Sequence, residues 1–383
     1  MVPLPDVHVI VDYRPALRAR TGIGEYVHEL ARALAASAPP GERLTLFSSS
    51  WADRFMPEVA VDIPAAARVD RRVPVRALTW AWHRAGWPPI ERLAGACDVV
   101  HSPTPLLVPA RHAAQVVTVF DLHFLHAPAQ TTGAVRRDFA RLARDHVRRA
   151  DHVLAGSAHA ASLVGSELGV PSDRITTTPL GAPGWAAEVR AARGRAVGST
   201  ILFLGTLEPR KNVGRLLDAY AALLARQPAA PPLVLAGRPT PAAADWLERL
   251  QTAPLAGRVR TLGYVDDETR RGLYRDARML VLPSLDEGFG LTALEALACG
   301  VPVVASTAGS LPEVVGDAGQ LVDPHDTAAW TAALASLLDD RAALAQGAGG
   351  PARAAAFTWT AAAAATRRAY ASAVNARRAR GPH

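Results

Sequence analysis

The chain of 383 residues has little of several residue types, and each shortage excludes a class of protein. Two cysteines, Cys97 and Cys299, are too few for a disulfide framework or a cysteine zinc site. No apolar run approaches the length of a membrane span. The N-terminal residues MVPLPDVHVIVDYRP lack a basic region followed by an apolar core, so they predict no signal peptide. We therefore expect a cytoplasmic protein.

Lysine is the scarcest charged residue. Lys211, in the stretch GTLEPRKN (205–212), is the only lysine among 42 Lys plus Arg residues, which leaves 41 arginines. The surplus of Ala, Arg, Gly and Pro indicates a coding bias that would favour arginine by default. A lysine kept against this bias suggests a specific role at residue 211, with chance retention as the alternative.

Arginine gives the chain a formal net charge of +7 and gathers at 68–76, at 136–149 and in the C-terminal tail. The stretch 134–150 predicts a helix with Arg137, Arg141, Arg144 and Arg148 on one face. This face is either solvated, with the opposite side packed on the core, or it binds anionic lipid headgroups. In the second case the protein would be peripheral at the inner face of the membrane. Nucleic acid is not expected as a partner, because no aromatic residues interleave with these arginines.

Short β-rich runs alternate with helical stretches along most of the chain. The first series is 7–12, 43–48, 98–102, 114–121, 151–157 and 175–181, and the second is 199–206, 231–237, 258–265, 278–284 and 301–306. Continuous apolar strands that alternate with helices indicate a parallel sheet covered on both faces. The pattern stops over 182–198, which we expect to be a linker. These observations predict an α/β fold of two doubly wound domains that face each other across a cleft.

The stretch LPSLDEGFGLTALEALACGVPVVAS (282–306) carries the most specific signal. A strand is followed by an acidic, Gly-rich loop and by a helix expected at 290–299, and such a loop and helix start form an anion site. Glu287 lies beside this site, and Glu295 follows eight residues later, about 12 Å along a helix. Two carboxylates at this separation would hold the hexose and the ribose of a nucleotide diphosphate sugar, with the diphosphate between them. For two glutamates without this context, a helix cap and a surface residue would be the simpler interpretation.

With the spacing Glu287-Gly-Phe-Gly-Leu-Thr-Ala-Leu-Glu295, the chain resembles the retaining glycosyltransferases of family 4, which have the GT-B fold of two facing Rossmann-like domains. GTLEPRKN, GYVDDETRRGLYRDARMLVLPS (263–284) and GSLPEVVGDAGQLVDP (309–324) extend this resemblance. It covers most of the chain, and its motifs are most specific in the last third. It implies an acceptor-binding domain at 1–183, a nucleotide-sugar-binding domain at 184–357, and a C-terminal helix at 358–383 that packs on the first domain.

The resemblance also implies roles for individual residues. Glu287 would contact hydroxyls of the donor sugar, Glu295 the ribose, and Arg210 and Lys211 the diphosphate, where arginine forks across two oxygens and lysine is a compact charge. The full set of implied donor contacts is Gly22, Gly24, Gly205, Arg210, Lys211, Gly288, Phe289, Gly290, Leu291, Thr292 and Glu295.

The segment VVTVFDLHFLHAP (116–128) departs from the family pattern. Close relatives usually have His-Asp-Leu here, whereas this chain has Phe120 in place of the histidine. Asp121 and His123 are still candidate catalytic residues at the end of a strand. For His123, a loop histidine without a catalytic role is the alternative.

Three tryptophans, Trp80, Trp82 and Trp87, lie close together in sequence. Trp80 and Trp87 would stack on an acceptor sugar, and His101 would line the same cleft. Packing in the core or in a lid is the more common use of clustered tryptophan, and we favour it.

No Asp-x-Asp metal motif is present, and Asp266-Asp267-Glu268 is typical of a helix N-cap. We therefore expect neither a metal nor a cofactor. The predicted activity is retaining transfer of a hexose, mannose as the first guess, from a nucleotide diphosphate sugar to a glycan, lipid-linked or small-molecule acceptor. A GT-B sugar-nucleotide epimerase or phosphorylase, and a non-catalytic module that binds sugar nucleotide or membrane, are the alternatives.

Overall fold

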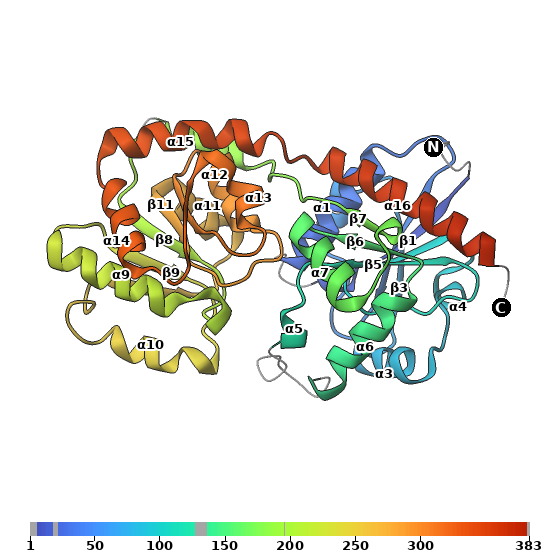
Figure 1. Ribbon diagram of the computed structural model, residues 1–383. Coiled ribbons are helices and arrows are strands. Elements are labelled where there is room, and N and C mark those ends of the chain that lie inside the picture. Colours follow the sequence, from blue (N-terminus) through green and yellow to red (C-terminus); the bar gives the residue numbers. More distant parts are fainter. Residues whose placement is uncertain (1–5, 18–21, 127–135, 195, 381–383) are drawn as a thin grey trace. The chain divides into compact units, whose positions relative to one another are not determined.

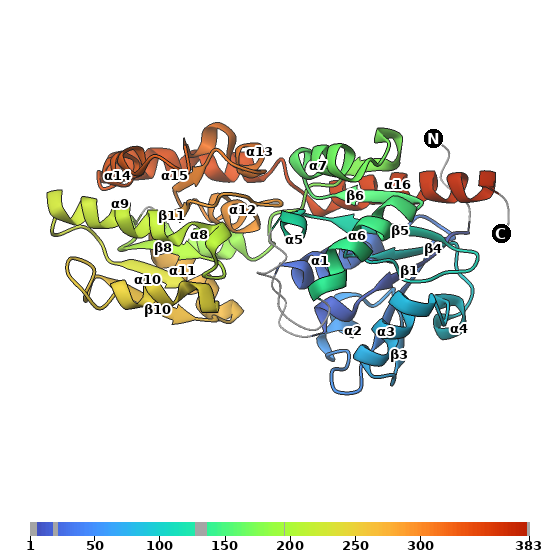
Figure 2. The same ribbon diagram turned by 60° about the horizontal axis from the view of Figure 1, so that its bottom comes forward.

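The structure is a computed structural model that describes residues 6–17, 22–126, 136–194 and 196–380. It divides into two compact units (Figure 1): unit 1 comprises Met1–Gly181 and Thr358–His383, and unit 2 comprises Ala182–Phe357. In each unit helices cover a central parallel sheet (Figure 2). This is the arrangement that alternating apolar strands and helices predict.

The sheet of unit 1 has seven parallel strands in the order β3-β2-β1-β4-β5-β6-β7. Their bounds are β1 His8–Asp12, β2 Arg43–Ser49, β3 Ala67–Arg71, β4 Val99–Ser102, β5 Ala114–Val119, β6 His152–Ala155 and β7 Ile175–Thr177. All residues of β1, β4 and β6 are buried, which explains their continuous apolar sequences. The strand order reverses between β1 and β4, which is the topological switch point of this unit.

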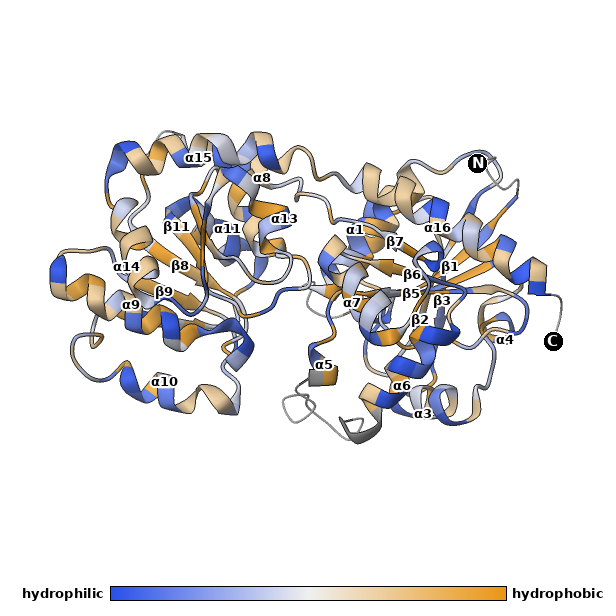
Figure 3. Cartoon of the chain, viewed as in Figure 1, coloured by the Kyte–Doolittle hydropathy of each residue, from blue (hydrophilic) through white to orange (hydrophobic). Residues whose placement is uncertain are grey.

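The helices of unit 1 pack apolar residues on the sheet and turn charged residues outward (Figure 3). They are α1 Ile23–Ala36, α2 Glu58–Asp62, α3 Val75–Ala85, α4 Ile90–Ala94, α5 His123–His126, α6 Arg136–Arg149, α7 Ala158–Leu168 and α16 Trp359–Arg380. Leu78 and Trp82 of α3 pack with Ile10 of β1. Val147 of α6 packs with Val117 of β5.

The C-terminal helix α16 lies against α1, β5 and β6. Its buried residues are mostly alanines, and these small side chains let the helix approach its neighbours closely. A Cβ on Gly181 would lie only 2.4 Å from the backbone nitrogen of Trp359, so no larger residue fits there. Arg367 fixes the helix by donating to Glu42 Oε2 at 2.9 Å and to the Leu34 carbonyl at 2.6 Å. Helix α16 is therefore an integral part of unit 1.

The sheet of unit 2 has six parallel strands in the order β10-β9-β8-β11-β12-β13. Their bounds are β8 Thr200–Leu204, β9 Leu233–Ala236, β10 Val259–Gly263, β11 Ala277–Leu282, β12 Val303–Ser306 and β13 Gln320–Val322. The helices are α8 Ala186–Arg193, α9 Val213–Arg226, α10 Ala244–Arg249, α11 Asp267–Asp276, α12 Leu291–Ala298, α13 Leu311–Val315, α14 Thr327–Ser336 and α15 Asp340–Ala354. Phe203, Tyr220 and Trp330 are fully buried in one core cluster between β8, α9 and α14.

The structure differs from the sequence-based expectation in three segments. Strands β3 and β13 were not expected, because β3 (ARVDR) is a charged edge strand and β13 has only three residues. The expected linker 182–198 contains helix α8, which belongs to unit 2. Trp185 stacks on Tyr274 of α11, with ring centroids 5.9 Å apart, so this segment is packed rather than extended.

Candidate functional site

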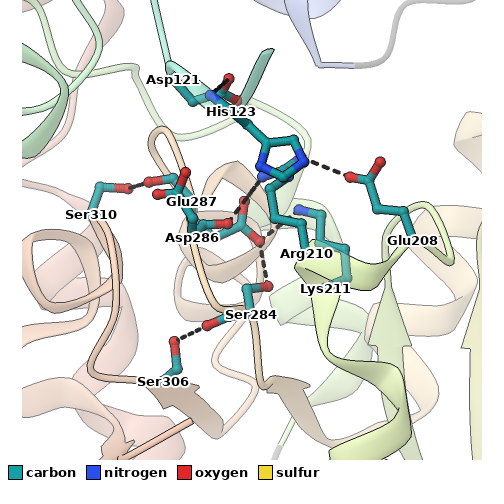
Figure 4. A network of polar contacts seen from close by, with 10 residues as sticks. All are labelled: Asp121, His123, Glu208, Arg210, Lys211, Ser284, Asp286, Glu287, Ser306 and Ser310. Carbon is teal, nitrogen blue, oxygen red and sulfur yellow. Dashed lines mark hydrogen bonds and ion pairs between the residues drawn. The ribbon is translucent and has the colours of Figure 1, made fainter. Parts of the chain in front are cut away.

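Two loops of unit 2 meet where the strand order reverses. Strands β8 and β11 are parallel neighbours in the middle of the sheet, and the chain continues from them to opposite edges. At such a switch point the loops after the two strands separate and leave a crevice that commonly binds ligands. The loop after β8 carries Arg210 and Lys211, and the loop after β11 carries Glu287 (Figure 4). The fold thus joins two motifs that are far apart in sequence.

Glu287 and Lys211 form a short ion pair at this point. Lys211 Nζ donates to Glu287 Oε1 at 2.6 Å, and Ser284 Oγ donates to the same oxygen at 2.7 Å. Burial alone would raise the pKa of Glu287. The charges of Lys211 and Arg210, with the hydrogen bonds from Lys211 and Ser284, outweigh burial and lower this pKa below its usual range. Glu287 is therefore an ionised carboxylate at neutral pH although its side chain is buried.

Arg210 is held differently from Lys211. Its Nη2 donates to Glu208 Oε1 at 2.9 Å and its Nη1 to the Asp286 carbonyl at 3.0 Å, while Glu287 Oε2 lies 3.6 Å from Nη1. The Arg210 carbonyl accepts from the backbone N–H of Leu285 at 2.8 Å. Arg210 therefore joins the two loops through several bonds, whereas the Lys211 ammonium is directed at one carboxylate.

A tight turn at Gly309 and Ser310 supports the Glu287 backbone. The N–H and the Oγ of Ser310 donate to the Glu287 carbonyl at 3.1 and 2.8 Å. Gly309 has φ +63°, and a Cβ there would lie 2.5 Å from the Glu287 nitrogen. The turn after β12 therefore requires glycine, and its hydrogen bonds fix the position of the Glu287 backbone.

Helix α12 begins just after this loop, as the sequence predicts. Gly290 precedes it with φ +94°, and its first residues are Leu291 and Thr292. The N–H groups of a first helical turn have no partner within the helix, which suits them to bind an anion. Phe289 is 5% exposed and packs edge-on to Phe357, so its ring is structural and only its backbone is suited to the predicted contact. Gly288 lies in the loop between Glu287 and Phe289.

Gly205 directly follows strand β8 and begins the loop that carries Arg210 and Lys211. A Cβ at this residue would lie 3.7 Å from Lys211 Cε. This is an ordinary van der Waals distance, and the predicted donor contact of Gly205 stays a prediction.

Glu295 has surroundings of its own on α12. Its Oε1 accepts from Arg270 Nη1 at 2.9 Å and its Oε2 from the Tyr274 hydroxyl at 2.7 Å. Burial raises the pKa of Glu295, and Arg270 and Tyr274 offset this only in part. With both oxygens engaged and 1% of the residue exposed, Glu295 does not present a free carboxylate to a ribose. The predicted ribose contact stays a prediction.

The candidate residues of unit 1 lie on several elements. Gly22 precedes α1 with φ +54°, and Gly24 is buried in the first turn of that helix. Asp121 Oδ1 accepts from the His123 N–H at 3.2 Å, which closes the turn after β5. The Phe120 ring meets Tyr26 edge-on at 4.8 Å. Phenylalanine in place of the usual histidine thus packs on α1.

The clustered tryptophans divide into two kinds. Trp82 is buried and donates from its ring nitrogen to the Pro88 carbonyl at 2.9 Å, which fits the expectation of core packing. Trp80 and Trp87 are 67% and 56% exposed, and Arg92 lies over the Trp87 ring. Only these two tryptophans are presented as stacking surfaces.

His101 does not fit its predicted place in an acceptor site. It is fully buried, and its two ring nitrogens contact the Tyr370 hydroxyl and Thr118 Oγ1, each at 2.8 Å. Burial lowers the pKa of His101 to about 3, although the Asp12 charge opposes this shift. The neutral ring joins α16 to the sheet, so we correct its assignment from acceptor contact to internal polar link.

Several site residues were missed by sequence reasoning: Glu208, Ser284, Ser306, Ser310, Arg270 and Tyr274. Ser284 and Glu208 lie within three residues of a predicted site residue, and this proximity was an available signal. The sequence carries no indication that Arg270 and Tyr274 bind Glu295, because this contact depends on how α11 packs against α12. Asp266 caps α11 as predicted and accepts from the Thr269 N–H at 2.8 Å.

The described part of the chain contains no group of three or more His, Cys, Asp or Glu side chains placed to hold a metal ion. None of its helices is both long and apolar enough to cross a lipid bilayer. The groups at the switch point of unit 2 include the cations of Arg210 and Lys211, the carboxylates of Glu208 and Glu287, and the start of α12. Two doubly wound parallel-sheet units are the architecture of the GT-B class.

Comparison with known proteins narrows this class. Residues 20–183 match Glycosyltransferase Family 4, and residues 198–340 match the Glycosyl transferases group 1 family. The chain is 32% identical over 371 residues to O-antigen chain mannosyltransferase B of Escherichia coli, which covers 92% of this chain and 96% of that protein. The chain therefore belongs to the group 1, family 4 glycosyltransferases, and it is a transferase.

Solved structures agree on the fold. Sucrose-phosphate synthase from Thermosynechococcus elongatus has a TM-score of 0.72 at 22% identity, covering 95% of this chain and 98% of that one. HepE of Anabaena, in complex with UDP-glucose, has a TM-score of 0.65 at 17% identity, covering 94% of this chain and 97% of that one. The expected GT-B architecture is confirmed.

Proposed function

We propose that this glycosyltransferase moves a hexose from a nucleotide diphosphate sugar to an acceptor hydroxyl, with retention of anomeric configuration and without a metal ion. The observation that carries the proposal is the cluster of Lys211, Arg210 and Glu287 at the switch point of unit 2. A dianionic diphosphate requires cations, and a neutral hexose requires hydrogen-bond acceptors. This cluster supplies both side by side.

In this reaction the two cations and the carboxylate act on different parts of the donor. As the bond between the anomeric carbon and the diphosphate oxygen breaks, negative charge grows on the leaving diphosphate, and Lys211 and Arg210 stabilise it. The acceptor oxygen bonds to the anomeric carbon on the same face, and its proton passes to a leaving phosphate oxygen. Glu287 accepts hydrogen bonds from donor hydroxyls. Asp121 and His123 remain predicted catalytic groups of unit 1.

The choice of donor sugar and acceptor to test rests only on similarity to other glycosyltransferases. The Escherichia coli relative is a mannosyltransferase, which supports mannose as the first donor sugar to test. The HepE structure holds UDP-glucose, which supports a nucleotide diphosphate hexose more generally. The acceptor would be a glycan, a lipid-linked sugar or a small molecule.

The test is donor turnover by the purified chain with GDP-mannose, UDP-glucose and related donors, with and without EDTA. We expect one donor to be hydrolysed or transferred, with the α or β configuration of the donor retained in the product by NMR. The same turnover is measured in Lys211→Ala. Its matched control is Arg226→Ala, which removes an exposed cation at the end of α9. Isomerised donor would indicate an epimerase, a phosphate requirement would indicate a phosphorylase, and an intact biological role in a Lys211→Ala chain would indicate a binding module.

Anionic lipid is the proposed surface partner, on helices α6 and α3 of unit 1. Exposed Arg144 and Arg149 lie on α6, whereas Arg148 also donates to the Leu168 carbonyl at 2.7 Å. His146 of α6 meets His83 of α3 with ring centroids 5.6 Å apart, so the helices are neighbours. The side chains of residues 134–138 lie outside the described part, Arg137 among them.

Helix α3 adds an aromatic group to this basic surface. Arg76, Trp80 and Arg84 follow each other at four-residue spacing and are exposed. Tryptophan and arginine together suit the headgroup layer of an anionic membrane. Sedimentation with phosphatidylglycerol vesicles should exceed that with phosphatidylcholine vesicles and should fall in Arg144→Glu but not in Arg226→Glu. Equal binding of both variants, or of both vesicle types, would contradict the proposal.

A further inference from the structure

Asn212 directly follows Lys211, at the junction of the 3-10 helix Pro209–Lys211 and helix α9. Its backbone is left-handed, with φ 54° and ψ 34°. Among the described residues, the only other non-glycine residue with positive φ is Asp6. Asparagine and aspartate adopt this conformation more readily than other residues with a side chain. The chain therefore turns sharply at the residue after the lysine.

The Asn212 side chain connects the loops that follow three strands. Its Nδ2 donates to the Pro283 carbonyl at 3.0 Å and to the Pro324 carbonyl at 2.9 Å. Pro283 follows β11, Pro324 follows β13, and Asn212 itself lies in the loop after β8. Both partners are acceptors, so only the NH2 end of the amide satisfies them.

Helix capping does not explain this side chain. An asparagine at a helix start commonly accepts a hydrogen bond from an N–H of the first turn. Asn212 makes no such side-chain bond to α9. The amide instead holds the Lys211 backbone at a fixed distance from the segment that leads to Glu287.

We propose that Asn212 is a positioning residue that holds the Lys211 ammonium against Glu287 by bonding the ends of β11 and β13. The expected effect of Asn212 on turnover rests on the proposed function. Its effect on the position of Lys211 can be tested without that function. Loss of the amide would leave the loops after β8 and β11 joined mainly through Arg210. The Lys211 ammonium, on its flexible stem, would then sample positions away from Glu287.

Two substitutions separate the side chain from the backbone turn. Asn212→Gly keeps the left-handed turn at no steric cost and removes the amide. Asn212→Ala removes the amide and also disfavours the turn. If the turn alone matters, glycine restores wild-type behaviour and alanine does not. If the amide positions Lys211, both variants are impaired.

Tyr220→Phe is the matched control for lost hydrogen bonds. The Tyr220 hydroxyl also contacts two backbone carbonyls, those of Pro231 and Arg258, at 2.9 and 3.3 Å. These carbonyls lie at the amino ends of β9 and β10, away from the switch-point loops. This variant removes one hydroxyl donor shared between two carbonyls in the same unit, without a contact to the lysine.

The single lysine provides a readout that does not depend on activity. In protein labelled with 13C-lysine, every side-chain signal belongs to Lys211. We expect Asn212→Gly to shift the 13Cε signal of Lys211 toward that of a solvated lysine, in the same direction as the shift expected for Glu287→Gln. Tyr220→Phe should leave it in place. An unmoved signal in Asn212→Gly would overturn the proposal.

Turnover adds the catalytic part of the test. With GDP-mannose or UDP-glucose as donor, we expect kcat of Asn212→Gly to fall about tenfold or more, with a smaller change in KM, because small misplacements of catalytic groups are costly. Equal kcat in Asn212→Gly and wild type, or an equal fall in Tyr220→Phe, would overturn the inference. If the wild type turns over no nucleotide sugar, the proposed function fails, and the lysine signal still decides whether Asn212 holds Lys211.

Discussion

Glu287 and Glu295 belong to one short motif, yet the structure gives them opposite electrostatic environments. The pKa of Glu287 is lowered, because Lys211 and Arg210 outweigh the effect of burial. The pKa of Glu295 is raised, because burial outweighs Arg270 and Tyr274. Glu287 sits in a loop fixed by neighbouring loops, whereas Glu295 is 1% exposed between two helices. Two residues of one motif therefore have different surroundings: Glu287 pairs with the cations of the loop after β8, and Glu295 bonds to two side chains of α11.

The largest effect is expected when the cation beside Glu295 is removed. Arg270→Ala leaves a buried carboxylate without its ion-pair partner, and breaking such a pair costs about 3–5 kcal/mol. Chemical denaturation should show this loss of stability. Arg271→Ala is the matched control, because Arg271 lies over the same Trp185 ring without an ion pair to Glu295. Similar stabilities for the two variants would contradict the structural role of the Glu295 pair.

Removal of the cation beside Glu287 should affect catalysis more than stability. Lys211→Ala should lower kcat about 100-fold and weaken binding of the nucleotide diphosphate, since such groups act on charge developed in the transition state. Lys211→Arg should restore neither fully, because the forked guanidinium does not reproduce a compact ammonium at 2.6 Å. Steady-state kinetics and calorimetry with UDP and GDP measure both. Full activity with arginine would mean that the lysine is incidental.

The pH dependence of stability should separate the two glutamates. The folded pKa of Glu287 is lowered, so its stabilising contribution is present above the unfolded pKa, about 4.3, and is lost as pH falls through the folded value. The stability advantage of wild type over Glu287→Gln should therefore shrink in acid. Melting temperatures of both proteins between pH 3 and 7 would show it. A constant difference would mean that Glu287 is not an ionised partner of Lys211.

The smallest change is expected for Glu295→Gln. The folded pKa of Glu295 is raised, so its contribution is fully present below the unfolded pKa and is lost as pH rises through the folded value. Near pH 7 the substitution should therefore change the free energy of unfolding by less than about 1.5 kcal/mol, the size of one net hydrogen bond. The advantage of wild type should shrink with rising pH, opposite to Glu287. Melting curves of the same pH series test this, and parallel slopes for both glutamates would contradict it.

Much of the fold could be predicted from local sequence. Apolar runs such as 7–12 and 199–206 form central strands, because a strand buried on both faces needs continuous apolar residues. The charged edge strand β3 was missed, since an edge strand need not be apolar. The packed segment around Trp185 was mistaken for a linker, because a helix of only eight residues carries little periodic signal.

The sequence by itself determined which residue types were available at the site. The sequence alone showed one lysine among many arginines, two glutamates eight residues apart, and glycines at the loop ends. These features identified the family through its motif. These signals are local, because backbone turns and helix starts depend on residues a few positions apart.

Only the tertiary structure decided which charges meet. The ion pair between Lys211 and Glu287 spans 76 residues, and it exists because β8 and β11 are adjacent in a parallel sheet. In unit 1 the packing of α16 buried His101, and in unit 2 the packing of α11 on α12 placed Glu295 beside Arg270. Strand order and helix packing are collective properties of the whole unit, and they set burial and distance. Burial and distance in turn fix the direction of each pKa shift, downward for Glu287 and upward for Glu295.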